Sequence, residues 1–385
     1  MSPPPGGGSM EHARNPTRVC DVLVIGSGLA GLCAARSAAE AGCKVIVLEQ
    51  EAEAGGGALV DRALASWRGD MLAALAAAPG VSLLTRHTAT EALVTASGKT
   101  AIVAATAAPH GHAGDTKDTA SQQRHHVINA SRILLATGAT ERLISLSGHD
   151  RPGVMLATAA RASVNRHATV PGQRAVFFVN NDEAYAAVRD LAAAAIAIGA
   201  VVDPRPPTAI SLDAQAEGLT VLSGHEVCAI EGEGHGNGMG ASTGRAASVL
   251  VREIGSGTSL RIPCDLVCLS GGYEPQVSLA RQAGLQVHWN DDIAGFAASA
   301  AGGIMVPVGA AAGVFGRLEA ARHGQQAGQA SALACGFSPK PAAFLPPVAA
   351  RRDAPILPLE HVAHKYALAT AGEDTGFADP ACSDL

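Results

Sequence analysis

The chain has 385 residues, of which 48% are hydrophobic and 3% aromatic, and its formal net charge is −6. This length is enough for two or three domains, and the composition predicts a large core built mainly from Ala, Val, Leu and Ile. The net negative charge gives no electrostatic reason to expect binding to nucleic acid or to an anionic membrane.

Residues 1–18 are rich in Pro, Gly and Ser and have no apolar run of the kind a secretory signal needs. We expect a disordered leader here. The eight cysteines form no C-x-x-C pair, which favours free thiols in a reducing compartment over disulfides or a metal cluster. Residues 293–316 carry no charge, but glycines and a proline interrupt them, so we expect a buried strand, turn and helix rather than a membrane span. A cytoplasmic protein is expected.

A glycine fingerprint lies between two predicted strands, residues 21–25 and 44–49, with a helix ending near Ala41 between them. Gly26 permits a tight turn, Gly28 lets the backbone approach a pyrophosphate, and Gly31 lets the helix pack on the sheet. Glu49 ends the second strand, where a carboxylate can accept hydrogen bonds from a ribose. The amides at the helix start favour a phosphate. Together these features predict bound adenine dinucleotide, either NAD or FAD.

The next segments predict a helix over residues 63–78, a strand over 81–84 and a β-hairpin arm over 89–104. Residues 105–126 are polar and predict a loop. This loop holds four histidines, which could bind a metal. They have no cysteine and no helical i, i+4 pair among them, so a solvated insertion is favoured: His110, His112, His125 and His126.

A strand over residues 127–135 leads into Ala136-Thr137-Gly138, which returns the chain to the dinucleotide. Residues 174–203 then repeat the strand–helix–strand pattern without the glycine fingerprint. The carboxylates of Asp182 and Glu183 would repel a pyrophosphate at this second helix start, which predicts the loss of ordinary nicotinamide binding. Strands are predicted over 249–254 and 260–269, a return strand and helix start over 303–313, and a closing helix over 319–335.

These segments predict an α/β fold with two Rossmann-like dinucleotide-binding domains, the second inserted into the first. The predicted boundaries are a leader at 1–18, a discontinuous FAD/NAD(P)-binding domain at 19–145 and 266–337, an inserted domain at 146–265, and an extended tail at 338–385. No catalytic residue and no metal ligand is predicted. The predicted cofactor-binding residues are Gly26, Gly28, Ala30, Gly31, Glu49, Gln50, Gly56, Thr137, Gly138 and Gly309.

Three runs outside the fingerprint resemble the alpha subunit of heterotetrameric sarcosine oxidase and the compact alpha subunits of opine oxidase and dye-linked proline dehydrogenase. The resemblance extends from about residue 21 to 334, and its specific motifs are ATGATER at 136–142, GHDRPGVMLA at 148–157 and NNDEAY at 180–185. It implies a fold of the FAD/NAD(P)-binding, pyridine nucleotide-disulfide oxidoreductase type.

The resemblance also implies a function. In that family a partner beta subunit, itself a flavoprotein, oxidises an amine or amino acid. The alpha subunit binds an adenine nucleotide and helps to enclose an FMN at its boundary with beta. The resemblance therefore implies a hetero-oligomeric oxidoreductase subunit that is not catalytically complete alone.

This sequence departs from the family pattern at several points. Ala310 stands where flavoproteins of this fold usually place an aspartate beside the flavin, Thr140 where a histidine is expected, and Leu143 where a proline is expected. The folate-binding domain of the sarcosine oxidase alpha subunit has no counterpart here, so folate chemistry is not expected. Two other functions remain open: a stand-alone NAD(P)H-dependent flavin reductase, and a non-catalytic nucleotide-binding assembly subunit.

Overall fold

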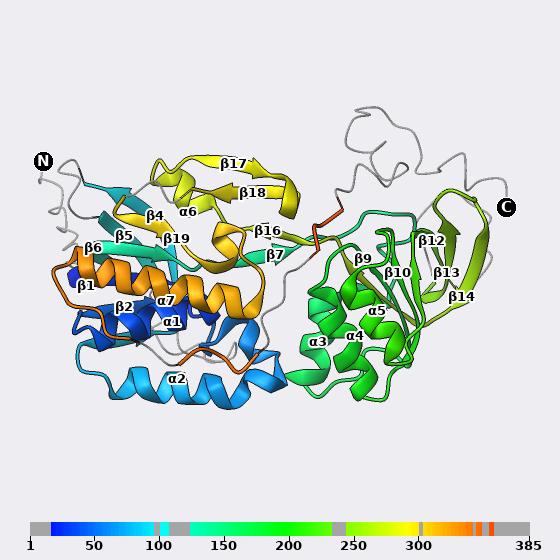
Figure 1. The fold of residues 1–385 in the computed structure, drawn as a ribbon, viewed down its shortest axis with the longest axis horizontal. Helices are drawn as coiled ribbons and strands as arrows, with labels where there is room; N and C mark the ends of the chain where they lie inside the picture. The colour runs from blue at the N-terminus through cyan, green and yellow to red at the C-terminus, as the bar shows by residue number, and fades with distance from the viewer. Residues whose placement is uncertain are drawn as a thin grey trace, which may run out of the picture.

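A computed structural model describes residues 17–95, 101–107, 124–232, 244–299, 303–341, 344–348 and 354–357. The chain forms two α/β units that lie side by side, as Figure 1 shows. The fingerprint sequence forms β1 (Thr17–Ile25), α1 (Leu29–Glu40) and β2 (Val45–Leu48), as predicted. Strand β1 begins inside the predicted leader because Thr17 pairs with Val127 of the neighbouring strand. The rest of the leader lies outside the described residues.

The first unit is built on a seven-stranded sheet. Its order is β3-β2-β1-β6-β5-β4, and β19 also pairs with β6. Strands β3, β2, β1, β6 and β19 pair in parallel. Strands β4 and β5 pair antiparallel with each other, and β5 pairs antiparallel with β6, which confirms the predicted hairpin. The added strands are β3 (Val81–Leu84), β4 (His87–Val94), β5 (Ala101–Ala107), β6 (Arg124–Leu135) and β19 (Met305–Pro307).

Three helices cover one face of this sheet. They are α1, α2 (Ala65–Ala77) and α7 (Arg317–Ala334). Helix α7 approaches α1 unusually closely. A Cβ on Gly324 would lie 2.0 Å from the carbonyl oxygen of Ala30, and one on Gly328 would lie 2.3 Å from that of Ala34. Only glycine fits at these two positions, so the closing helix is fixed against the fingerprint helix.

The opposite face packs against a small layer above the sheet (Figure 1), and side chains of β4 and β5 join the same apolar cluster. This layer contains α6 (Ser278–Gln282) and the antiparallel pair β17 (Val287–Asn290) and β18 (Gly295–Ala298). Short 3₁₀ turns complete the unit: η1 (Gly56–Leu59), η2 (Arg62–Leu64), η3 (Asp291–Ile293) and η4 (Gly309–Ala312). Among the described residues, no helix has the length and apolar character that crossing a bilayer requires.

The inserted unit has a parallel five-stranded sheet in the order β11-β10-β9-β15-β8 and a separate three-stranded antiparallel sheet, β12-β13-β14. Its helices are α3 (Ala157–Asn165), α4 (Ala184–Ala193) and α5 (Ala209–Ala216). Its strands are β8 (Val154–Leu156), β9 (Arg174–Val179), β10 (Ala197–Asp203), β11 (Val221–Ser223), β12 (His225–Gly232), β13 (Ala246–Glu253), β14 (Ser259–Pro263) and β15 (Leu266–Ser270).

The predicted boundary between residues 265 and 266 lies before β15, whereas the pairing places β15 in the sheet of the inserted unit. Residues 260–269, predicted as a single strand, form most of β14 and most of β15, and β15 pairs with both β9 and β8. Its residues are fully buried, which fits a central parallel strand covered on both faces. The return therefore begins after Ser270, through β16 (Tyr273–Pro275), which pairs with β7 (Ala139–Glu141).

The described parts of the tail contain no helix or strand, but they pack against the fold. Phe344 is buried, and its carbonyl oxygen accepts a hydrogen bond from the Trp67 indole at 2.8 Å. The Arg36 guanidinium lies 4.4 Å from the centre of the Phe344 ring. Ile356 is buried in a separate apolar cluster with Ile293 and its neighbours. The tail thus contributes to the core of the molecule.

Candidate functional site

Two of the fingerprint glycines are required by the protein's own packing. Gly26 has φ +101°, and a Cβ there would lie 2.2 Å from the carbonyl oxygen of Ala136, at the end of β6. A Cβ on Gly31 would lie 2.0 Å from the carbonyl oxygen of Gly26. The turn, the first helix and the end of β6 are therefore in direct backbone contact, as the fingerprint predicts.

Gly28 is different because the protein does not require a glycine there. Its φ of −67° suits any residue, and a Cβ would meet nothing within 4 Å. Gly28 is also the N-cap of α1, where no side chain caps the helix and no acidic residue lies in the first turn. The first amides of a helix have no partner within the helix. A space left open above such amides fits a phosphate group.

Glu49 is fixed beside this turn although it is charged and only 6% exposed. One carboxylate oxygen accepts from both the backbone amide and the hydroxyl of Ser27, and the other accepts from the amide of Glu51 at 2.8 Å. The oxygen that accepts from Glu51 is Oε1. Because a carboxylate oxygen has two lone pairs, Oε1 can accept from one more donor, such as a ribose hydroxyl. No sequence pattern indicated that Ser27 would connect the glycine turn to the carboxylate.

Two further predicted glycines bring distant loops to the start of α1. Gly56, at the beginning of η1, has φ +51°, and a Cβ there would lie 2.9 Å from the Cα of Gly28. Gly309, at the beginning of η4, has φ +61°, and a Cβ there would lie 2.6 Å from the Cβ of Ala30. Four segments, from β1, η1, β6 and η4, therefore meet at one helix end.

The remaining predicted residues lie at the edge of this cluster. The amide nitrogen of Thr137 lies 3.4 Å from the Cβ position of Gly26, and the Thr137 hydroxyl donates to the carbonyl oxygen of Gln276 at 2.9 Å. Gly138 has φ +76° and an open Cβ position. Gln50 is exposed beyond Glu49. The structure thus brings Gly26, Gly31, Gly56 and Gly309 together at the start of α1. Within the described residues, no contact places Gln50 or Gly138 there, and the binding of a cofactor by any of these residues stays a prediction.

The return segment supplies no carboxylate at this cluster. Ala310 follows Gly309, and the Gly309 amide donates to Nδ1 of His323 on α7 at 3.3 Å. Burial lowers the pKa of His323, so its ring is neutral near pH 7 and Nδ1 acts as an acceptor. No sequence signal pointed to His323. It holds the backbone of the turn beside Ala30.

The GHDRPGVM run, one of the motifs that carry the family resemblance, forms a joint within the inserted unit. Gly148 has φ +79°, and a Cβ there would lie 2.2 Å from the carbonyl oxygen of Ile230 in β12. The Arg151 guanidinium donates to the carbonyl oxygens of Ile230 at 3.1 Å and Gly244 at 3.2 Å. This motif therefore attaches the three-stranded sheet to the unit.

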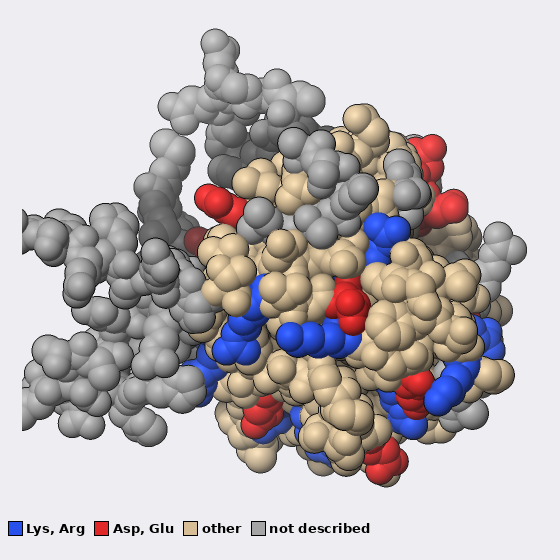
Figure 2. Space-filling model, turned by 90° about the vertical axis from the view of Figure 1, so that its left-hand side faces the viewer, with Lys and Arg blue, Asp and Glu red and all other residues tan. Residues whose placement is uncertain are grey.

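A metal site finds no support in the part of the chain that the structure describes. No group of three or more His, Cys, Asp or Glu side chains is arranged to hold a metal ion there. His110 and His112 lie outside the described residues. The prediction of a loop through His125 and His126 is wrong, because both belong to β6, and His126 is buried. On the face drawn in Figure 2, basic and acidic side chains are interspersed among uncharged ones, with no broad area of one sign.

The chain is similar to known proteins over most of its length. A model of the pyridine nucleotide-disulphide oxidoreductase family matches residues 20–295. The chain is 34% identical to the alpha subunit of sarcosine oxidase from Corynebacterium sp. strain P-1 over 82% of this chain and 33% of that protein. It is 26% identical to the A-type subunit of opine oxidase from Agrobacterium tumefaciens, over 71% of this chain and 56% of that protein. The resemblance seen in the sequence is confirmed.

Solved structures share the fold. L-proline dehydrogenase from P. horikoshii has a TM-score of 0.58 and 16% identity, covering 84% of this chain and 57% of that chain. Thioredoxin reductase from T. acidophilum has a TM-score of 0.59 and 15% identity, covering 83% of this chain and 98% of that chain. The predicted α/β fold with two nucleotide-binding-type units is confirmed. The chain spans about a third of the length of the sarcosine oxidase alpha subunits it matches.

Proposed function

The chain belongs to the pyridine nucleotide-disulphide oxidoreductase family, and from this membership we propose that it is the nucleotide-binding, alpha-type subunit of a flavin-dependent amine or amino-acid oxidoreductase. The observation that carries the proposal is the start of α1, where the open Gly28 position lies beside the buried carboxylate of Glu49. The relatives named as oxidase subunits supply the reaction class.

The cofactor proposed for the first unit is NAD or FAD, held mainly through its ADP half. The amides at the start of α1 would bind the pyrophosphate and Glu49 would accept from the adenosine ribose. Gly56 and Gly309 would let their loops approach the same nucleotide. When bound, either cofactor supplies a two-electron redox centre. The ADP half is common to both, and Ala310 removes the carboxylate that flavoproteins of this fold usually direct at the other half.

Amine oxidation is assigned to a partner, a flavoprotein beta-type subunit, with an FMN shared at the boundary. The relatives named as subunits of sarcosine oxidase and opine oxidase support a complex of more than one chain. A small-molecule amine or amino acid is the proposed substrate of the complex. The seven described cysteines are all free, which supports a cytoplasmic location.

The test is to co-express the chain with a flavoprotein encoded beside it and to purify the complex. Nucleotides released by denaturation are identified by chromatography and mass. We expect one NAD or FAD per alpha-type chain, and oxidation of secondary amines such as sarcosine or proline with a dye as electron acceptor. Calorimetry that detects no uptake of either dinucleotide, by the chain alone or in the complex, would refute the proposal.

The same preparations separate the two other functions. Rapid oxidation of NADH by the isolated chain with added flavin would support a stand-alone flavin reductase. A stable complex that contains no flavoprotein and oxidises no amine would support an assembly subunit.

A further inference from the structure

The inserted unit has a second place where a dinucleotide would be expected. In an open parallel sheet, nucleotides bind at the carboxyl ends of the strands, with the pyrophosphate at a helix start. Here β9 ends at Val179, and residues 180–183 lead into α4. Strand β10 ends beside them, and so does β15. Five polar residues at this edge are almost completely buried: Asn180, Asn181, Asp182, Asp203 and Ser270.

The start of α4 is capped by the protein itself. The side-chain oxygen of Asn181 accepts from the amide of Ala184 at 3.1 Å. The side-chain nitrogen of Asn181 donates to the hydroxyl of Ser270 at 2.9 Å and to its carbonyl oxygen at 3.2 Å. The amide that a pyrophosphate would need is therefore engaged by a buried side chain that Ser270 holds in place through two hydrogen bonds.

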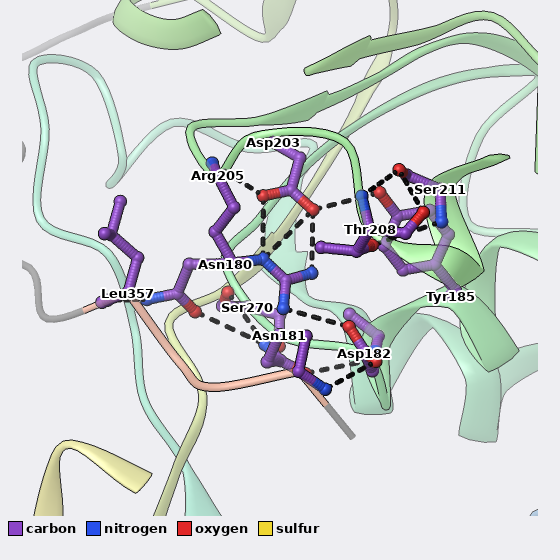
Figure 3. Close-up of polar contacts among 12 residues, drawn as sticks. Asn180, Asn181, Asp182, Tyr185, Asp203, Arg205, Thr208, Ser211, Ser270 and Leu357 are labelled. Atoms are coloured by element: carbon purple, nitrogen blue, oxygen red, sulfur yellow. Dashed lines mark hydrogen bonds and ion pairs between the residues drawn. The ribbon is translucent and has the colours of Figure 1, made fainter. Parts of the chain in front are cut away.

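The charges at this edge also oppose a phosphate. Arg205 is 3% exposed and pairs with Asp203 at 2.8 Å and with Asp182 at 2.9 Å. Asp203 also accepts from the Tyr185 hydroxyl at 3.0 Å. Two carboxylates share one guanidinium in this network, shown in Figure 3, which leaves one net negative charge in a buried setting. The residues present do not fit a pyridine nucleotide.

A segment of the tail lies against this same edge. The amide of Ala354 donates to the second carboxylate oxygen of Asp182 at 3.0 Å, and the side-chain nitrogen of Asn180 donates to the carbonyl oxygen of Leu357 at 3.0 Å. Figure 3 shows this segment running from Leu357 past Asn180 toward Asp182. The side chains of Asn180 and Asp182 are both more than nine-tenths buried, and each bonds a backbone group of the segment, which is how an extended peptide is recognised.

The side chain of Ile356 provides an apolar anchor between these two polar contacts. It is 6% exposed and packs in a cluster with Ile293, Ala294 and Ala297 of the first unit, and its amide donates to the carbonyl oxygen of Asp292 at 3.0 Å. The segment Ala354–Leu357 thus contacts the inserted unit through Asn180 and Asp182 and the first unit through the residues around Asp292.

We infer that the second nucleotide edge is a peptide-binding site whose ligand is this chain's own segment Ala354–Leu357, in the place of a pyridine nucleotide. The tail then acts as a strap that joins the two units across the crossover strands β7 and β16. Gly272 immediately precedes β16, and a Cβ on it would lie 2.9 Å from Cδ1 of Ile356. The anchor therefore packs directly against that crossover.

Amide hydrogen exchange on the full chain tests the strap directly. We expect the amides of Ala354 and Ile356 to exchange about tenfold or more slowly than in a free peptide of the same sequence, because both donate hydrogen bonds to the folded protein. Ile356→Asp should raise both rates to near the peptide value. Pro355→Ala is the matched control, since that side chain is exposed. Free-peptide rates in the wild-type chain would overturn the inference.

A second test adds the segment back as a separate molecule. A fluorescent peptide of residues 351–360 should bind the full-length Ile356→Asp chain, measured by fluorescence polarisation. It should bind the wild-type and Pro355→Ala chains at least about tenfold more weakly, because the tethered segment competes at high effective concentration. Equal binding to all three chains would overturn the inference. Calorimetry that finds two NAD(P)H molecules bound per full chain would also overturn it. Binding of one molecule or of none would agree with a second nucleotide edge that is closed by the segment.

Discussion

Asp61 of the first unit forms an ion pair with Arg161 of the inserted unit, with Oδ2 and Nη2 3.3 Å apart. The same oxygen pairs with Arg317 at 2.5 Å, where α7 begins, and Asp61 is only 5% exposed. Arg161 is also bound by Asp190 at 2.5 Å within its own unit. One buried carboxylate therefore joins η2, α3 and α7 at the contact between the two units.

Replacing Asp61 should destabilise the chain. Asp61→Asn leaves two guanidinium groups facing each other without the charge between them, although Arg161 keeps Asp190. We expect a loss of about 2 kcal/mol in the free energy of unfolding, measured by urea denaturation. Glu53→Gln is the control, because its pair with Arg166 also crosses between the units but Glu53 is 61% exposed. That variant should lose less than about 0.5 kcal/mol. Equal losses would contradict the role given to Asp61.

The fingerprint glycines should separate into a ligand position and a packing position. Gly28→Ala should unfold like the wild type, because its Cβ enters open space, but should bind NAD or FAD at least about tenfold more weakly if a phosphate lies there. Gly31→Ala should lose about 2 kcal/mol or more of stability, because its Cβ meets the Gly26 carbonyl oxygen. Thermal unfolding and calorimetric titration check both. Normal binding by Gly28→Ala would show that the phosphate lies elsewhere.

Glu49→Gln should weaken dinucleotide binding by about tenfold, because a charge-assisted hydrogen bond to the ribose is lost. The change keeps the side-chain shape, so the Ser27 contacts can persist through the amide oxygen. Glu51→Gln is the control, since Glu51 contributes only its backbone amide to this network. Titration with both NAD and FAD measures the effect. An unchanged affinity would remove Glu49 from the proposed site.

The regular elements of the first unit could be predicted because local sequence determines them. The glycines at 26, 28 and 31 and the apolar runs on either side predict the strand, helix and strand that the structure contains. The contact of Gly324 and Gly328 with α1 could not be predicted, because it depends on residues almost 300 positions apart. In the sequence these glycines only weaken a predicted helix.

The strand β15 and the tail show a second limit. An apolar run predicts a buried strand but does not say which sheet receives it, so the boundary predicted at 265 and 266 lies one strand before the return seen in the structure. The tail residues 354–357 form no helix or strand, and nothing in their composition indicates that Asp182 and Asn180 would bind them. Partners are set by the tertiary fold, and short polar segments carry little of that information.

Two helix glycines should respond to alanine in opposite directions. Gly69→Ala should stabilise the chain by about 0.5–1 kcal/mol, because Gly69 is exposed inside α2 and its Cβ position is open. Gly324→Ala should destabilise it by about 2 kcal/mol or more, because the added carbon would press the Ala30 backbone away. Urea unfolding of both variants gives the comparison. A neutral Gly324→Ala would mean that α7 can move away from α1 at little cost.

The carboxyl group of Glu141, at the end of the crossover strand β7, should make the stability of the chain depend on pH. Glu141 is 8% exposed, and one of its oxygens accepts from the amide of Thr158 at 2.9 Å and from the Thr158 hydroxyl. Burial raises the pKa of Glu141, and the Thr158 donors only partly oppose this. The folded chain therefore holds this proton more tightly than the unfolded chain does. The resulting stabilisation is complete below the unfolded pKa, about 4.3, and is lost as pH rises through the raised folded value.

Glu141→Gln removes this titration while it keeps an acceptor for Thr158. We expect the stability of the variant, measured relative to the wild type by urea unfolding between pH 5 and 8.5, to improve steadily as pH rises. Each unit of pKa displacement is worth about 1.4 kcal/mol across the full transition. Glu91→Gln, at an exposed position of β4, should follow the wild-type profile throughout. Parallel profiles for the wild type and Glu141→Gln would mean that the Thr158 donors offset the burial of the charge, leaving the crossover without a pH-sensitive group at this position.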